Sequence, residues 1–113
     1  MDKITKYKAI VRGLMQEIAA ISPSDEQVET QLIMDDERGH YLLYSVGWEA
    51  KNWVYGSFVH LDVKDTGKVW LQHDGTDLKV AEELARKGIP KKDIVIGFQP
   101  PHARAVMGEF AVA

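Results

Sequence analysis

Residues 68–90 read KVWLQHDGTDLKVAEELARKGIP, and this stretch predicts one strand followed by one helix. Val69–Leu71 is rich in β-branched and aromatic residues, which is typical of a strand. Gly75 ends that run, and Thr76 is a suitable N-cap for a helix that starts after it. Beyond the helix, Ile94–Phe98 is a second apolar run, so the stretch predicts most of a strand–helix–strand unit.

Charged residues and a C-cap signal mark the two ends of this helix, the C-terminal end most clearly. Asp77 in the first turn and Arg86-Lys87 in the last turn each complement the helix dipole. Gly88 suits a left-handed C-cap and Pro90 prevents continuation of the helix. One apolar stripe is expected along the helix, made of Leu78, Ala81, Leu84 and Ala85.

The rest of the chain predicts a helix and then a meander of strands. Asp2–Ile21 is amphipathic, because large apolar residues recur at spacings of three and four. Short turn-forming segments then separate strand-like runs, and short connections mean antiparallel neighbours. The expected strands are Val28–Met34, His40–Trp48, Trp53–Lys64 and Lys68–His73, with turns at Asp35–Gly39, Glu49–Asn52 and Asp65–Gly67.

These elements predict an α+β fold: an N-terminal helix, a four-stranded antiparallel meander, a second helix and a fifth strand, with both helices on one face. Residues 1–113 are expected to form a single domain. After Phe98 the chain becomes irregular, and the prolines of Gln99–His102 argue against helix or central strand. Phe110–Ala113 is a short apolar end, either tucked into the body or an edge strand.

The register of the meander predicts which sheet face meets the helices. A four-residue second turn places Trp48 opposite Trp53, Val46 opposite Tyr55 and Leu42 opposite Val59, and a two-residue third turn places Val63 opposite Trp70. The face with the tryptophans is then the more apolar one, and we expect the helices to cover it. The other face is half apolar, which makes it a candidate contact surface. Its candidate partner-binding residues are Tyr41, Leu43, Phe58, His60, Asp62, Leu71 and His73.

Composition limits the classes of function. The net charge is −3, which argues against binding of duplex DNA by the free chain, because such binding draws its affinity from clustered Lys and Arg. There is no cysteine, which excludes disulfides and thiolate metal sites. No apolar run is long enough for a membrane span and there is no signal-peptide pattern, so a cytoplasmic location is expected.

Three residues form a candidate metal or acid–base cluster. His60 and His73 are expected to be cross-strand neighbours, with Asp62 pointing the same way. Polar residues on a half-solvated strand face are the better interpretation, so neither a metal site nor a cofactor is expected. No nucleotide-binding or hydrolase motif occurs, so no catalytic residue is predicted. Trp48, Trp53 and Trp70 could stack on bases, but without interleaved basic residues a core role is favoured.

Several ordered segments resemble the fdxN element excision controlling factor family, the XisI-like proteins. The strongest are Val69–Thr76, VWLQHDGT, and Gly88–Val95, GIPKKDIV. Further matches lie at 1–7, 29–33, 36–41, 46–48, 54–56, 60–65 and 110–113, so the resemblance covers nearly the whole chain.

This resemblance implies a role in the programmed excision of a DNA element. Members act with a recombinase and a companion excision factor, and the family has no established catalytic residues. We therefore expect a non-enzymatic regulatory subunit that binds a companion excision protein or recombinase, or a second copy of itself, and that meets DNA only indirectly and no membrane. Two alternatives remain at this point: a direct DNA-binding accessory factor, and a small metal-dependent enzyme that uses His60, His73 and Asp62.

Overall fold

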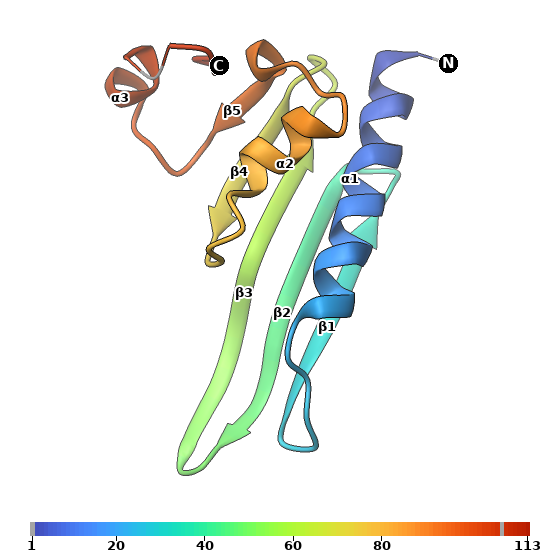
Figure 1. Ribbon diagram of the computed structural model, residues 1–113, viewed down its shortest axis with the longest axis vertical. Helices are drawn as coiled ribbons and strands as arrows, with labels where there is room; N and C mark the ends of the chain where they lie inside the picture. Colours follow the sequence, from blue (N-terminus) through green and yellow to red (C-terminus); the bar gives the residue numbers. More distant parts are fainter. Residues whose placement is uncertain (1, 107) are drawn as a thin grey trace.

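One five-stranded sheet organises the chain, in the order β1-β2-β3-β4-β5 (Figure 1). The computed structural model describes residues 2–106 and 108–113; Met1, the first residue of the segments that carry the resemblance, lies outside the described residues. The elements are α1 (Lys3–Ile21), β1 (Val28–Asp35), β2 (His40–Glu49), β3 (Asn52–Val63), β4 (Val69–Asp74), α2 (Val80–Arg86), the 3-10 turn η1 (Lys91–Asp93), β5 (Ile94–Ile96) and α3 (Pro101–Ala105).

The strand pairing confirms the predicted α+β class. β1 to β4 are antiparallel neighbours, and β5 lies parallel to β4 after the α2 crossover. The predicted order of helix, meander, second helix and fifth strand is therefore confirmed. β5 is shorter than expected, since it ends at Ile96 and not at Phe98.

The first helix follows the expected amphipathic pattern. Its N-cap is Asp2, whose carboxylate accepts a hydrogen bond from the Thr5 backbone N–H at 2.8 Å. One side of α1 is buried, and its buried residues are Tyr7, Val11, Leu14, Met15 and Ile18. Among the described residues, no helix combines the length and apolar character of a membrane span.

The second helix starts later than predicted. Residues 75–79 form a turn before the helix, because the carboxylate of Asp74 accepts hydrogen bonds from the backbone N–H groups of Thr76 and Val80. The chain enters the helix through Lys79, which has a left-handed φ of 55°. Thr76 is therefore not the N-cap, and Leu78 lies outside the helix.

The end of α2 is as predicted. Gly88 has a φ of 116°, in the region that favours glycine. Its N–H donates to the Ala85 carbonyl at 3.2 Å, and the next N–H, of Ile89, donates to the Leu84 carbonyl at 3.1 Å. This pair of bonds is the Schellman motif, and Ile89 is fully buried beside it.

Both helices pack on one side of the sheet, as predicted (Figure 1). For β2 and the first half of β3 this is the opposite side to the one expected, whereas Val59 and Val63 lie beneath the helices as expected. The predicted β2–β3 register fails at a bulge between Leu43 and Tyr44. The β3–β4 register differs from the turn onwards, where Val63 pairs with Val69 and not with Trp70, and a second bulge between His60 and Leu61 restores the predicted pairing of His60 with His73. Each bulge shifts the pairing by one residue and so exchanges the faces beyond it. The side under the helices is lined by Tyr41, Leu43, Val59, Leu61, Val63, Val69 and Leu71, all buried.

The tail covers the β5 edge of the sheet. Ala111 forms an isolated parallel bridge with Val95, and its N–H donates to the Ile94 carbonyl at 2.9 Å. Phe110 packs partly buried against the core, so the C-terminal segment combines the two predicted alternatives and forms no full edge strand. The expectation that residues 99–102 are not helical is wrong for α3. Pro101 is the first residue of that helix, where a backbone N–H has no helical partner to lose.

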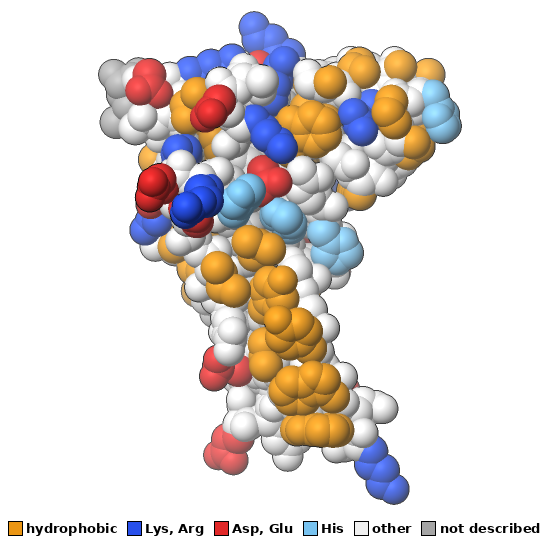
Figure 2. Space-filling model, turned by 180° about the vertical axis from the view of Figure 1, so that it is seen from behind, with side chains coloured by type: hydrophobic (Ala, Val, Ile, Leu, Met, Phe, Trp, Pro, Cys, Tyr) orange, Lys and Arg blue, Asp and Glu red, His pale blue; other side chains and the backbone are white. Residues whose placement is uncertain are grey.

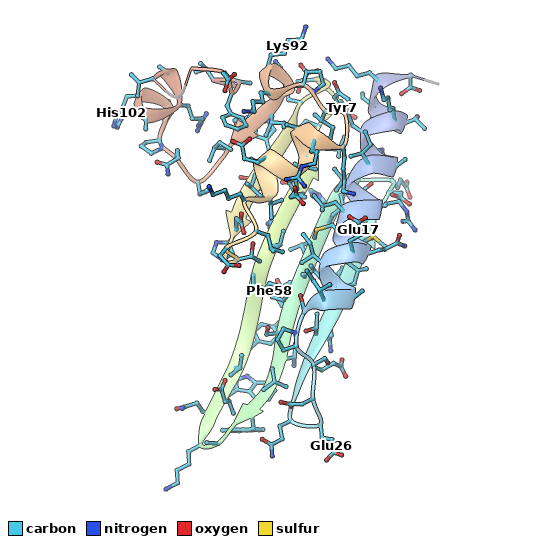
Figure 3. The ribbon with its side chains drawn as sticks, viewed as in Figure 1. Tyr7, Glu17, Glu26, Phe58, Lys92 and His102 are labelled. Carbon is cyan, nitrogen blue, oxygen red and sulfur yellow. The ribbon has the colours of Figure 1, made fainter. Side chains whose placement is uncertain are left out.

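A buried carboxylate ties the start of α1 to η1. Asp93 accepts a hydrogen bond from the hydroxyl of Tyr7, a residue of α1 (Figure 3), and forms an ion pair with Lys3 Nζ at 3.0 Å. Burial acts to raise the pKa of Asp93, but the bonds from Tyr7 and Lys3 outweigh it and hold the pKa below its usual value. Burial and the same carboxylate raise the pKa of Tyr7 to about 12. At neutral pH the tyrosine is therefore the donor and the aspartate is ionised.

Replacing Gly88 with Val should lower the free energy of unfolding by more than about 1 kcal/mol, because a β-branched side chain is strained at this φ. Gly13→Ala is the matched control. Gly13 lies in α1 with open space where a Cβ would stand, so this change should stabilise the protein by up to about 1 kcal/mol. Urea denaturation measures both. An unchanged stability in Gly88→Val would show that the cap is unimportant.

Asp93→Asn should cost about 1–3 kcal/mol at pH 7, because it weakens a buried charged acceptor. Folding lowers the pKa of Asp93, so the stability that the ionised carboxylate contributes is fully present above its unfolded pKa of about 3.9. That stability is lost as the pH falls through the lower pKa of the folded state. The deficit of the variant should therefore shrink between pH 7 and pH 3. Exposed Asp77, replaced by Asn, serves as control; an Asp93→Asn deficit that is the same at both pH values would contradict this account.

Candidate functional site

The side of the sheet away from the helices, here called the open face, carries a continuous line of apolar side chains. Figure 2 shows it running down the molecule from a group of histidines to one end of the long axis. The line follows the β2–β3 hairpin, where alternate residues face the same way. We call it the aromatic stripe: Leu42, Tyr44, Val46, Trp48, Trp53 and Tyr55.

Two cross-strand aromatic pairs build the stripe. The rings of Trp48 and Trp53 lie 5.4 Å apart and are tilted by 54°, and those of Tyr44 and Tyr55 lie 5.6 Å apart. The predicted pairing of Trp48 with Trp53 is confirmed. These side chains remain exposed: 56% for Trp48, 53% for Trp53 and 66% for Tyr55. A line of large apolar groups this exposed is typical of a contact surface.

A polar group lies beyond the stripe on the same face, and we call it the His–Asp cluster: His40, His60, Asp62 and Gln72. One oxygen of Asp62, Oδ1, lies 2.7 Å from His40 Nδ1 and 2.9 Å from His60 Nε2. The other oxygen accepts a hydrogen bond from Gln72 Nε2 at 3.1 Å. The carboxylate is therefore fully engaged by side chains from three neighbouring strands.

The cluster keeps its carboxylate ionised. Asp62 is only 6% exposed, and burial by itself would raise its pKa. The hydrogen bonds from His40, Gln72 and His60 outweigh burial and lower the pKa below its usual value. A buried anion thus faces two imidazole rings that are themselves partly open to solvent.

The predicted contact residues divide between the two faces. Tyr41, Leu43 and Leu71 lie in the core beneath the helices, so their assignment to an exposed face is wrong. Phe58, the extra residue of the β3 bulge, is partly buried against the core. The residues of the predicted set that lie on the open face are His60, Asp62 and His73.

His73 is the cross-strand neighbour of His60, as predicted, but it is not in the cluster. Its Nε2 lies beside Gly75, 3.4 Å from where a Cβ would stand. The imidazole that completes the group is that of His40, which pairs directly with Asp62 across β2 and β3. Sequence reasoning missed His40 and placed the aromatic stripe under the helices. The alternation of apolar residues in β2 was a sufficient signal for the stripe once its side of the sheet was known.

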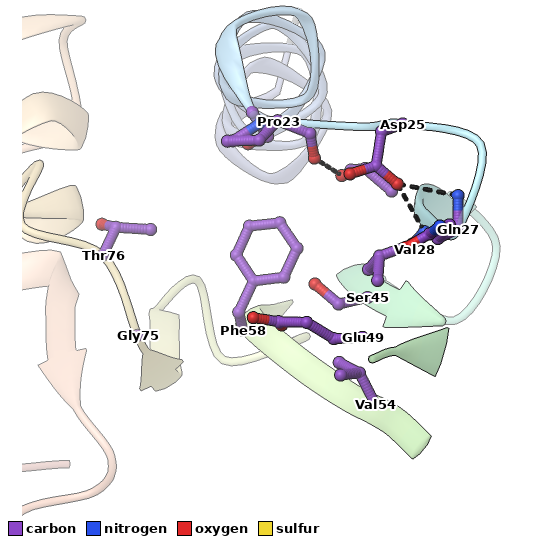
Figure 4. A pocket seen from close by; sticks show the side chains of 12 residues that line it. Pro23, Asp25, Gln27, Val28, Ser45, Glu49, Val54, Phe58, Gly75 and Thr76 are labelled. Carbon is purple, nitrogen blue, oxygen red and sulfur yellow. Dashed lines mark hydrogen bonds between the residues drawn. The ribbon is translucent and has the colours of Figure 1, made fainter. Parts of the chain in front are cut away.

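A cleft of about 540 Å³ opens on the helix side, beneath the loop that follows α1 (Figure 4). Phe58 forms one wall and points towards Pro23 in that loop. Asp25 accepts bonds from the backbone N–H groups of Gln27 and Val28, which lower its pKa. Its carboxylate serves the turn and does not converge with another titratable group, so the open face is the stronger candidate site.

Comparison with protein families gives one match, to the family described as XisI protein, over residues 1–112. The chain belongs to the XisI family. The resemblance inferred from the sequence segments is thereby confirmed. No curated protein matches the chain significantly.

Two solved XisI-type structures share this fold. A XisI-like protein from Anabaena variabilis is 44% identical, with a TM-score of 0.91, and the alignment covers 97% of this chain and 99% of that one. The fdxN element excision controlling factor XisI from the same organism is 34% identical, with a TM-score of 0.87, and the alignment covers 99% and 100%. The one-sided helix layer and the open face are thus set in an architecture that these two structures share.

Two substitutions on β3 distinguish the two faces. Phe58→Glu should lower the free energy of unfolding by more than about 2 kcal/mol, because it places a charge against the core. Trp53→Glu should cost less than about 1.5 kcal/mol, since it removes a half-exposed side chain and one aromatic pair. Thermal or urea denaturation of both variants provides the comparison. Equal destabilisation by the two changes would contradict the face assignment.

Proposed function

We propose that this XisI-family chain is a non-enzymatic controlling factor for the excision of a DNA element, and that it acts by binding a companion protein through its open face. The observation that supports the proposal is the exposed aromatic stripe on a sheet whose other face is covered. One solved relative is an fdxN element excision controlling factor, which gives the role its direction.

The stripe has the chemistry of a protein-binding surface. Its exposed members are tryptophans and a tyrosine, which are enriched among the residues that dominate binding energy. The His–Asp cluster at one end of the stripe supplies a polar border to this apolar surface. Rigid strand residues also lose little conformational freedom on binding.

The charge of the same face argues for a protein partner over DNA. None of the residues of β1–β5, all of which the structure describes, is lysine or arginine. Lys64 and Arg104 do reach this face, but both lie over the Trp70 ring and not along the stripe. Glu29 and Asp35 of β1 share the open face with the stripe. A surface that neutralises phosphates needs the opposite charge, so we expect contact with DNA to pass through the partner.

Trp53→Glu should abolish or weaken capture of the companion at least about tenfold, because it places an unpaired charge in the apolar centre of the interface. The test co-expresses the chain with a tagged candidate companion, the protein encoded beside it in the genome, and measures capture. Ile21→Glu is the matched control: this residue is 68% exposed on the helix side, and its replacement should leave capture unchanged.

Three results would count against the proposal. One is capture that Trp53→Glu leaves intact in a folded variant. Another is tight binding of the free chain to duplex DNA at physiological salt, with affinity falling steeply as salt rises. The third is a stable homodimer that Trp53→Glu dissociates while the companion is not captured, which would assign the stripe to self-association.

A further inference from the structure

We propose that His40, His60 and Asp62 form a binding site for a divalent transition metal ion of the zinc type. The aromatic stripe supplies no donor atom to this site, so metal binding can be measured without the companion protein. Its three donor atoms, one from each residue, all lie within 4.8 Å of one another.

The donor atoms need little movement to take an ion. In a tetrahedral site with bonds of about 2.0–2.1 Å, neighbouring donor atoms lie about 3.3 Å apart. The two imidazole nitrogens lie 2.7 Å and 2.9 Å from the same carboxylate oxygen. Each of these two distances would need to open by roughly half an ångström to reach the metal-binding value, and the two nitrogens already lie within 4.8 Å of each other.

The sheet holds the three side chains in place. His40 and Asp62 are directly paired residues of β2 and β3, and His60 precedes Asp62 by two positions on the same face. Gln72 of β4 holds the second carboxylate oxygen, so that Oδ1 stays aimed at the two rings. An outer hydrogen bond that orients a ligating carboxylate is a usual part of metal sites.

The donor set selects the class of ion. Two imidazole nitrogens and one carboxylate oxygen suit zinc, cobalt, nickel or copper, whereas magnesium and calcium favour sites made entirely of oxygen donors. Three protein ligands leave a coordination position free. The side chains of His40 and His60 are 49% and 30% exposed, so that position opens to solvent on the open face.

The test uses the full, tag-free chain after treatment with a chelator. Zinc is titrated by calorimetry, and cobalt by its visible absorption, which reports the coordination geometry directly. We expect one ion per chain with a micromolar or tighter dissociation constant, and a cobalt spectrum of tetrahedral or five-coordinate type. His40→Gln and His60→Gln should each weaken binding at least about tenfold.

The remaining histidines provide matched controls. His73→Gln changes the cross-strand neighbour of His60, and His102→Gln changes a histidine on α3, beyond the β5 edge (Figure 3). Both variants should bind zinc as the unsubstituted chain does. His40→Gln alters a half-exposed side chain, so circular dichroism should show a folded protein.

The proposal fails if the unsubstituted chain shows no saturable binding, which would leave a purely hydrogen-bonded cluster. The proposal also fails if both His40→Gln and His60→Gln still bind zinc with unchanged affinity. A third contrary result would be a control variant, His73→Gln or His102→Gln, that loses zinc binding as fully as the His40 and His60 variants.

Discussion

A single extra residue in β3 decides which side chains the helices cover. Phe58 stands between Ser57 and Val59 with no partner of its own on β2. Because the side-chain period of a strand is two, one inserted residue moves every side chain beyond it to the other face. Odd-numbered residues of β3 therefore lie on the open face before the bulge and in the core after it: Trp53 and Tyr55 on the open face, Leu61 and Val63 in the core.

The helix layer then fixes what remains uncovered. α1 packs on β1, β2 and β3 and α2 on β4, all from one side, and the tail occupies the β5 edge. Arg104 of the tail lies over the Trp70 ring, 5.2 Å from its centre, so this tryptophan of the open face has a partner within the chain. Trp48 and Trp53 lie at the far end of the β2–β3 hairpin, and each keeps about half of its surface exposed. The tail thus covers part of the open face near β5, and the face stays exposed to solvent along the β2–β3 hairpin.

The parts of the fold that local signals determine were predictable from sequence. The end of α2 at Gly88 and the pairing of Trp48 with Trp53 each depend on a few neighbouring residues, and both agree with the structure. The bulges were not predictable, because β2 and β3 carry apolar residues on both faces and a one-residue slip leaves no polar residue in an obviously wrong place. The same slip concealed the site. The unbulged register sets His40 opposite Leu61, whereas the bulge sets it opposite Asp62.

The two features of the open face differ in what they contribute to folding. Asp62 is buried and hydrogen-bonded to three side chains, so its removal would leave polar groups without partners, and part of its role is structural. The aromatic stripe is different, because a side chain that stays half exposed transfers little of its apolar surface out of water when the chain folds. Folding therefore gives a weak physical reason for two tryptophans and two tyrosines on one exposed hairpin. Burial by another protein gives a stronger one, since only that step removes the remaining surface of these rings from water.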